Sequence, residues 1–196
     1  MRRIIFASGN DGKVEEVRYI MSDLNLQILS LSDIDFTGNI EETGSTFEEN
    51  ARIKAVEIFK RYMLPTIADD SGLVVDQING EPGIYSARYS GQDATDKKNN
   101  QKLIEKLKKF NKPHNAKFVC AAVFYNGKNF STALGEVNGE IIYEERGTNG
   151  FGYDPIFIPN GFKKTMAELE PSIKNKISHR YNAFSKLKNI LSEKSE

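Results

Sequence analysis

Residues 3–17 read RIIFASGNDGKVEEV, and this stretch decides the class of fold. The apolar run at its start predicts a buried strand, and the residues at 8–12 predict a turn. From Lys13 onward, Val14 and Val17 begin an apolar stripe at helical spacing. A buried strand, a glycine loop and a helix in this order are typical of α/β proteins. We therefore expect helices packed on a sheet.

A hairpin in the middle of the chain adds antiparallel strands to that sheet. Asn126-Gly127 is a dipeptide that favours a hairpin turn, and apolar runs at 116–125 and 130–137 flank it. Strands joined by so short a turn run in opposite directions and pair with each other. We expect further strands at 24–31, 64–69, 72–78 and 156–158. The sheet should therefore be mixed.

Helix signals complete the expected fold. Ser45 and Thr46 are each followed three residues later by a glutamate, which gives two overlapping capping boxes and predicts the start of a long helix. Residues 97–112 carry lysines opposite an apolar stripe, as on a solvated helix face, and Ser178 should cap a final helix. We expect an α/β fold with a mixed central sheet and flanking helices, in a single domain over residues 1–196.

Composition is that of an ordinary globular protein. The 196 residues include 27 Lys and Arg and 27 Asp and Glu, so the formal net charge is zero. This balance argues against a protein whose main partner is nucleic acid. No apolar run approaches the roughly 18 residues of a membrane span, so no membrane partner is expected. The single cysteine, Cys120, lies in an apolar run. We expect it to be a buried bystander in a reducing cytoplasm.

The loop at 8–13 is the first candidate site, with residues Ser8, Gly9, Asn10, Asp11, Gly12 and Lys13. It joins a buried strand to a helix, so its backbone amides and the positive end of the helix would stabilise an anion. Its glycines do not have Walker A spacing, and Val14 stands where that motif has a magnesium-binding hydroxyl. The loop is either a phosphate cradle or an ordinary glycine turn.

Carboxylates form the second candidate site. Asp69 and Asp70 follow an apolar run, at the end of a strand where α/β proteins bind ligands. Because strand side chains alternate, only one of the two should face a given site. Glu41 and Glu42 offer further oxygen atoms, which suit magnesium or manganese, whereas two histidines and one cysteine do not suggest zinc. The alternative is an aspartate turn beside an acidic helix start.

The glycine-rich segment at 147–155 is the third candidate site. Glycines on both sides of Phe151 would leave the face of its ring open to a planar base, or the aromatics of this loop return to the core. Lys174, His179 and Arg180 gather hydrogen-bond donors at a helix start, unless this is only a capped and solvated helix end. Such donors suit a purine with a 6-keto oxygen, because the amino group of adenine would leave them unpaired.

Six motifs, in order along nearly the whole chain, resemble those of the inosine triphosphate pyrophosphatase family. They are SGNDGK at 8–13, EETG with TFEENA at 41–51, ADDSGL at 68–73, PGIYSARY at 82–89, GFGYDP at 150–155 and ISHR at 177–180. Two positions depart from the family pattern: Ser8 replaces a threonine and keeps its hydroxyl, and Asn149 replaces a glycine before the base loop.

This resemblance implies hydrolysis of non-standard purine nucleoside triphosphates, such as ITP, dITP and XTP, to the monophosphate and pyrophosphate, which cleanses the nucleotide pool. It also implies an elongated, two-lobed fold with the substrate in a cleft, and a homodimer. Residues 8–13 would hold the triphosphate with Lys13 at the reacting group. Glu41 and Asp70 would bind magnesium, and Asp70 would also accept a proton. The remaining substrate-binding residues would be Asn50, Lys54, Ser71, Phe151, Gly152, Tyr153, Asp154, Lys174, His179 and Arg180.

Two other functions fit the same sequence features. A related pyrophosphatase could act on pyrimidine or modified nucleotides through the same polyphosphate site and a different base pocket. A non-catalytic module could bind nucleotides or nucleic acid through the lysine-rich stretches, and its retention on DNA would then depend on salt. The carboxylates at Glu41 and Asp70 favour catalysis over the second alternative.

Overall fold

The computed structural model describes residues 2–193. Its strands are β1 (Arg2–Phe6), β2 (Leu26–Leu29), β3 (Thr66–Val75), β4 (Asn115–Tyr125), β5 (Phe130–Ile141) and β6 (Phe157–Pro159). Its α-helices are α1 (Asp11–Ile20), α2 (Phe47–Tyr62), α3 (Asp96–Leu107), α4 (Pro171–Ile177) and α5 (His179–Glu193). Short 3₁₀ helices are η1 (Ser32–Ile34), η2 (Asp76–Ile78), η3 (Gly83–Arg88) and η4 (Asp154–Ile156). None of the helices within residues 2–193 has the length and apolarity needed to cross a membrane.

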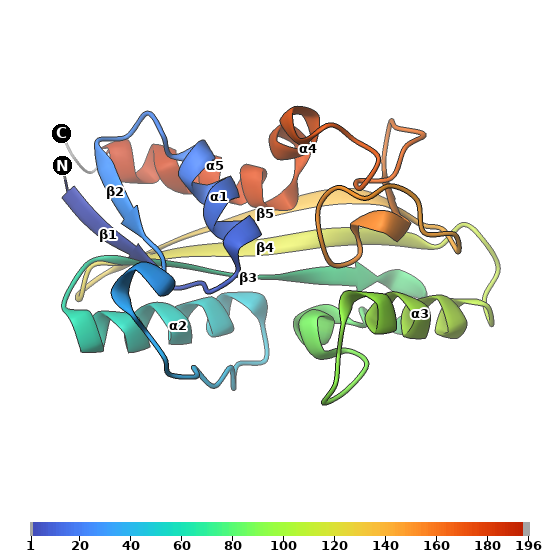
Figure 1. The fold of residues 1–196 in the computed structure, drawn as a ribbon, viewed down its shortest axis with the longest axis horizontal. Helices are drawn as coiled ribbons and strands as arrows, with labels where there is room; N and C mark the ends of the chain where they lie inside the picture. Colours follow the sequence, from blue (N-terminus) through green and yellow to red (C-terminus); the bar gives the residue numbers. More distant parts are fainter. Residues whose placement is uncertain (1, 194–196) are drawn as a thin grey trace. The chain divides into compact units, whose positions relative to one another are not determined.

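The six strands form one sheet in the order β2-β1-β3-β4-β5-β6 (Figure 1). Strand β1 pairs in parallel with both β2 and β3, whereas β5 and β6 are antiparallel. The α/β class and the mixed sheet with flanking helices are confirmed.

Two strands are longer than the sequence suggests. The segments expected as separate strands at 64–69 and 72–78 form the single strand β3, which stays extended through Asp70 and Ser71. Likewise β5 runs through Asn138-Gly139 without a break, since Gly139 pairs with Pro159 of β6. Helix α4 is not indicated by the sequence signals; it contains Lys174, so this residue lies in α4 and not at the start of α5.

The contacts of the chain divide it into two compact units. The first comprises residues 1–70, 120–135 and 180–196, and the second comprises 71–119 and 136–179. The single domain expected over residues 1–196 stays a prediction.

In the first unit, helices cover both faces of the sheet (Figure 1). Phe6 and Ile67 pack with Phe184 of α5 and with the apolar stripe of α1. On the other face, Ala51 and Ile58 of α2 pack against buried residues of β1, β3 and β4. In the second unit, Leu103, Ile104 and Leu107 of α3 pack into a separate core with buried residues of β3, β4 and β6.

Helix α2 begins at one of the two expected capping boxes. The hydroxyl of Thr46 accepts a hydrogen bond from the backbone N–H of Glu49 at 3.1 Å. The carboxylate of Glu49 reaches back to the backbone N–H and the hydroxyl of Ser45, each at 2.7 Å. This cap fixes the start of the helix that carries Asn50 and Lys54.

Candidate active site

The loop at 8–13 is a tight turn closed by its own side chains. The backbone N–H of Asn10 donates to the Ser8 hydroxyl at 3.2 Å, and the Asn10 side chain accepts from the backbone N–H of Lys13 at 3.0 Å. Asn10 thereby caps α1, and the loop lies at the positive end of this ten-residue helix. Such an end stabilises an anion, as the sequence suggests.

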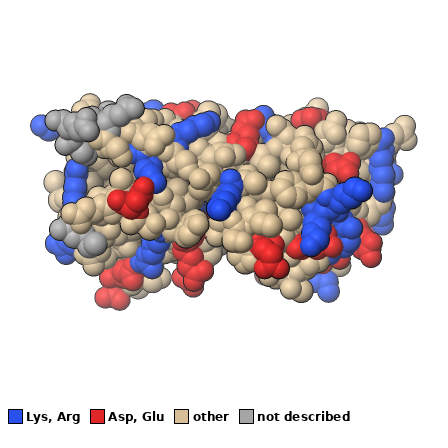
Figure 2. Space-filling model, turned by 90° about the horizontal axis from the view of Figure 1, so that it is seen from above, with Lys and Arg blue, Asp and Glu red and all other residues tan. Residues whose placement is uncertain are grey.

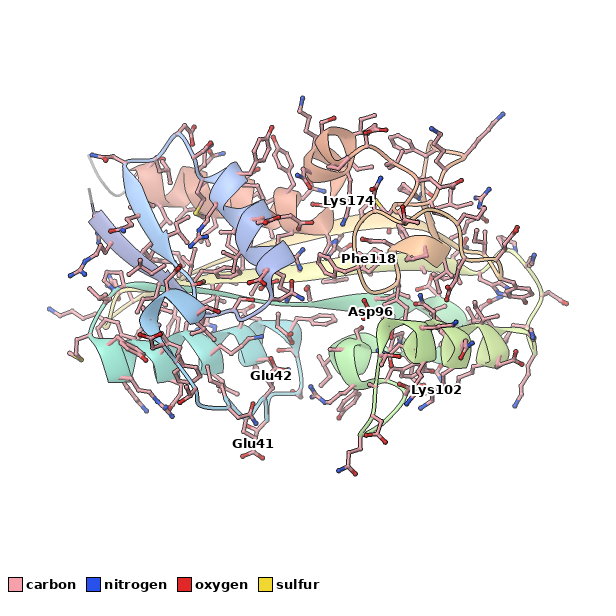
Figure 3. All side chains as sticks on the ribbon, viewed as in Figure 1. Glu41, Glu42, Asp96, Lys102, Phe118 and Lys174 are labelled. Carbon is pink, nitrogen blue, oxygen red and sulfur yellow. The ribbon has the colours of Figure 1, made fainter. Side chains whose placement is uncertain are left out.

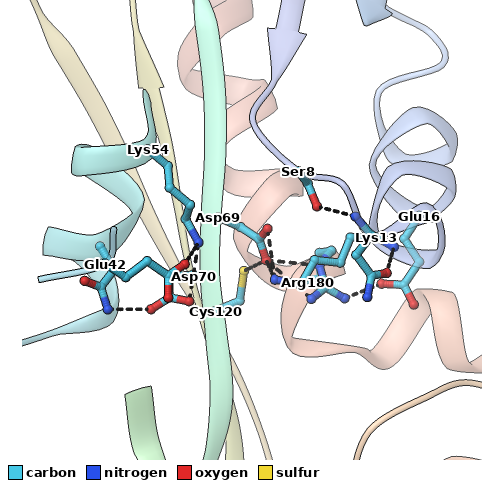
Figure 4. A network of polar contacts seen from close by, with 11 residues as sticks. Ser8, Lys13, Glu16, Glu42, Lys54, Asp69, Asp70, Cys120 and Arg180 are labelled. Carbon is cyan, nitrogen blue, oxygen red and sulfur yellow. Dashed lines mark hydrogen bonds and ion pairs between the residues drawn. The ribbon is translucent and has the colours of Figure 1, made fainter. Parts of the chain in front are cut away.

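Lys13 is held by Asp69. Its Nζ atom lies 3.1 and 3.3 Å from the two carboxylate oxygens of Asp69, which is 1% exposed. Nε and Nη2 of Arg180 donate to the same carboxylate at 3.3 Å each, and Nη1 of Arg180 donates to Glu16 (Figure 4). Burial alone would raise the pKa of Asp69, but the charges of Lys13 and Arg180 outweigh it and hold that pKa well below its usual range.

Asp70 has a different set of partners. Asn50 Nδ2 donates to one of its oxygens at 3.1 Å, and Lys54 Nζ lies 3.5 Å from the other. Lys54 Nζ also lies 2.7 Å from Glu42 (Figure 4). Burial raises the pKa of Asp70, and the nearby charge of Glu42 adds to that effect while Lys54 opposes it. The two adjacent aspartates therefore contact different residues, as alternation along a strand requires.

The carboxylate that lies with Asp70 is Glu42, not Glu41. Glu41 is exposed, and Figure 3 shows it at the outer bend of the loop before α2. Neighbouring side chains of an extended loop point in different directions, and the ion pair with Lys54 draws Glu42 inward. The predicted pairing of Glu41 with Asp70 is thus not formed in this structure.

The oxygen atoms at this site fit a magnesium ion that is also bound by phosphate. Within the described part of the chain, no group of three or more His, Cys, Asp and Glu side chains is arranged to hold a metal. Magnesium in phosphate-handling sites commonly takes only one or two carboxylates and fills its other positions with water and phosphate oxygens. Asp70 and Glu42, both in contact with Lys54, are such a pair.

The glycine-rich loop at 147–155 in the second unit brings Phe151 and Asp154 together with Lys174 of α4. Asp154 accepts a hydrogen bond from the backbone N–H of Phe151 at 3.0 Å and forms an ion pair with Lys174 at 2.7 Å. Lys174 Nζ lies 4.9 Å from the centre of the Phe151 ring. Gly150 has φ +80°, and a Cβ there would lie 2.1 Å from an Asp154 oxygen, so this turn requires glycine.

The aromatics of this loop have different environments. Tyr153 is 4% exposed and donates from its hydroxyl to the carbonyl of Ser86 at 2.8 Å, so its ring returns to the core. Phe151 is only partly buried.

His179 is buried and stacks on Phe118, with ring centres 4.8 Å apart. Ser71, which begins the second unit, is partly buried in β3.

Arg180 contacts two carboxylates of the first unit. Its fully buried guanidinium bonds to Asp69 and Glu16, and its role in the base pocket stays a prediction. A guanidinium needs anionic partners when it is buried, and these two carboxylates supply them. Sequence reasoning missed Glu16 because its partner is 164 residues away along the chain.

Known proteins resemble this chain over nearly its full length. Residues 4–190 match the model of the Ham1 family. The chain belongs to this family. It is 48% identical over 193 residues to a dITP/XTP pyrophosphatase of Bacillus subtilis, covering 97% of this chain and 98% of that protein. It is 47% identical over 195 residues to a dITP/XTP pyrophosphatase of Bacillus licheniformis, covering 98% and 100%.

Solved structures of Ham1 proteins share the fold. A HAM1 protein from Coxiella burnetii superimposes with a TM-score of 0.90 at 41% identity, covering 98% of this chain and all of that one. The Staphylococcus aureus Ham1 protein has a TM-score of 0.88 at 42% identity, with the same coverage. The resemblance to the inosine triphosphate pyrophosphatase family is thereby confirmed.

Proposed function

We propose that this Ham1 protein hydrolyses non-standard purine nucleoside triphosphates, namely ITP, dITP and XTP, to the nucleoside monophosphate and pyrophosphate. Two relatives named dITP/XTP pyrophosphatases match it over 97–98% of its length at 47% and 48% identity. The observation that carries the proposal is the placement of Asp70. It is a buried carboxylate with a raised pKa, in contact with Asn50 and Lys54, in the same unit as the glycine loop.

The two aspartates are suited to different tasks. Asp69 is fixed as a carboxylate by Lys13 and Arg180, so it is a poor proton acceptor. The raised pKa of Asp70 makes its carboxylate the better base for a proton from the attacking water. Lys54 holds Asp70 and Glu42 in place, and Lys13 with the amides of the loop at 8–13 stabilises the negative charge of the polyphosphate.

A divalent cation fits the carboxylates of Asp70 and Glu42. When bound, magnesium would neutralise charge on the phosphates and help pyrophosphate to leave. Dependence on magnesium or manganese is part of the proposal. So are a homodimer and a cytoplasmic location, which the family resemblance implies.

Recognition of the base is assigned to the second unit. The partly buried ring of Phe151 offers a surface for stacking a planar base. Lys174 carries donor hydrogens beside that ring, which suit an oxygen at position 6 of a purine. ATP has an amino group there and should be a poor substrate.

The face shown in Figure 2 gives no support to a nucleic-acid-binding module. On the face that Figure 2 shows, Lys and Arg are interspersed with Asp and Glu. A binding surface for a nucleic-acid backbone is instead a continuous basic patch.

Pyrophosphate release from a nucleotide panel tests the proposal. We expect turnover of ITP, dITP and XTP in the presence of magnesium, and much lower rates for ATP and dUTP. Removal of magnesium with a chelator should abolish turnover if the cation is required. Preference for dUTP would indicate a pyrimidine or modified-nucleotide pyrophosphatase. Tight nucleotide binding without pyrophosphate release would exclude the proposed reaction.

A further inference from the structure

Helix α3 holds the glycine-rich loop at 147–155 through a single residue, Gly152. The backbone N–H of Gly152 donates to Asp96 Oδ2 at 2.7 Å, and the carbonyl of Gly152 accepts from Asn100 Nδ2 at 3.2 Å. Asp96 and Asn100 are four residues apart, so they lie on one face of α3 in successive turns. Figure 3 shows Asp96 at the start of this helix. Both backbone polar groups of one loop residue are thus bound by one helix.

These two bonds fix the loop beside Phe151. Gly152 has φ +63°, a conformation in which a residue with a side chain would be strained. On the other side of Phe151, Asp154 binds its backbone N–H at 3.0 Å, and the side chain of Asn149 donates to the carbonyl of Leu169 at 3.1 Å. The backbone is therefore held both before and after the ring.

The burial of Asn100 indicates that its bond to the loop matters. The residue is 2% exposed, and its Oδ1 atom has no hydrogen-bond partner among residues 2–193. A buried amide oxygen without a partner destabilises the fold, and an apolar side chain would avoid that cost. An apolar residue could not donate the hydrogen bond that Nδ2 makes to the Gly152 carbonyl. This bond therefore explains why an asparagine occupies the position.

We infer that Asp96 and Asn100 are positioning residues for base recognition. They hold the backbone N–H and carbonyl of Gly152 so that the Phe151 ring is in place before a nucleotide binds. This inference rests on the proposed function, since it assumes that Phe151 receives the base. A loop that must first be ordered weakens binding, whereas the reacting phosphates are assigned to other residues. Loss of either contact should therefore raise KM and leave kcat nearly unchanged.

Three variants separate this role from a general effect on stability. For Asp96→Ala we expect the KM for dITP to rise about tenfold, with kcat changed by less than about twofold. Asp96→Asn should recover most of the loss, because its amide oxygen can still accept the Gly152 hydrogen bond. Both variants remove the negative charge at the start of α3, so only the acceptor distinguishes them. Glu105→Ala, at an exposed position of the same helix, is the matched control.

Hydrogen exchange tests the contact without relying on activity, and its first comparison needs only the wild-type protein. In the wild-type protein the Gly152 amide should exchange much more slowly than the amides of the exposed residues Gln92 and Asp93, and Asp96→Ala should abolish that protection. Equally fast exchange at these positions in the wild type would overturn the inference, as would an unchanged KM in Asp96→Ala or an equal loss in Asp96→Asn. If the wild type turns over none of the nucleotides, the proposed function fails, while the exchange result still decides whether the contact exists.

Discussion

Asp69 and Asp70 are adjacent in the sequence, but their pKa values are shifted in opposite directions. The pKa of Asp69 is lowered because Lys13 and Arg180 outweigh its burial, whereas burial and Glu42 raise the pKa of Asp70. The alternation of strand side chains predicts that the two face different partners. It does not predict which partners those are, because Arg180 lies 111 residues away along the chain.

Replacement of Asp70 tests its assignment as the base. Asp70→Asn removes the proton acceptor and keeps the shape, so kcat for dITP should fall roughly 10²- to 10⁴-fold. Far-UV circular dichroism should remain that of the wild type. Asp23→Asn, which changes an exposed aspartate in the same unit, should keep full activity. Wild-type turnover by Asp70→Asn would remove this residue from the chemistry.

The glutamates before α2 require a direct comparison. The structure places Glu42 with Lys54, whereas the sequence resemblance assigns the metal to Glu41. We expect Glu42→Gln to raise the magnesium concentration needed for half-maximal activity about tenfold or more, since a ligand carboxylate would be lost. Glu41→Gln should cause a smaller change. A larger change in Glu41→Gln would restore the assignment made from the sequence.

Phe151 tests base stacking. Stacking of a base on an aromatic ring contributes about 1–3 kcal/mol, so Phe151→Ala should raise the KM for ITP about tenfold or more. Phe162→Ala changes an exposed phenylalanine of the same unit and serves as the control. An unchanged KM in Phe151→Ala would count against stacking on this ring.

At the scale of elements, the start of α2 was predictable, whereas α4 and the continuity of the long strands were not. Thr46 acts through a bond to a neighbouring residue, so its position alone indicates a helix start. Ser178 directly precedes α5, and its backbone N–H donates to the carbonyl of Lys174 in the last turn of α4. The segments Asp69-Asp70-Ser71-Gly72 and Asn138-Gly139 also resemble turns, yet both are extended. Tertiary pairing decides those cases, as it does for Gly139 opposite Pro159.

The cap of α2 gives a prediction for this element. Thr46→Ala removes the side-chain acceptor for the Glu49 N–H, which should lower the free energy of unfolding by about 1 kcal/mol. Urea denaturation measures this change. Thr37→Ala, in an exposed part of the preceding loop, should have little effect. Equal stabilities of the two variants would show that the cap contributes nothing measurable.

For the molecule as a whole, unfolding should depend on pH through His114. This residue is 1% exposed, with Nδ1 and Nε2 each 2.7 Å from the side chains of Gln77 and Tyr143. Burial, then the charge of Lys112, lowers its pKa, and Glu140 opposes this. The unfolded chain therefore binds a proton at a higher pH than the folded protein does.

Stability should accordingly be lost as the pH falls through the normal histidine pKa of about 6.5 towards the lowered folded value. Denaturation of the wild type and of His114→Asn, measured from pH 7.5 to 5.5, isolates this contribution. The difference in stability between the two proteins should shrink at the acidic end. A difference that is constant with pH would contradict the assignment.

The single cysteine provides a natural reporter of how often the first unit opens. Cys120 is fully buried, and its Sγ atom lies 3.8 Å from Asp69. Burial raises the pKa of the thiol, and the charge of Asp69 adds to that effect, so almost no thiolate exists in the native state. Alkylating reagents should consequently modify this protein only during transient exposure of the interior, and the labelling rate would count those events without any engineered probe.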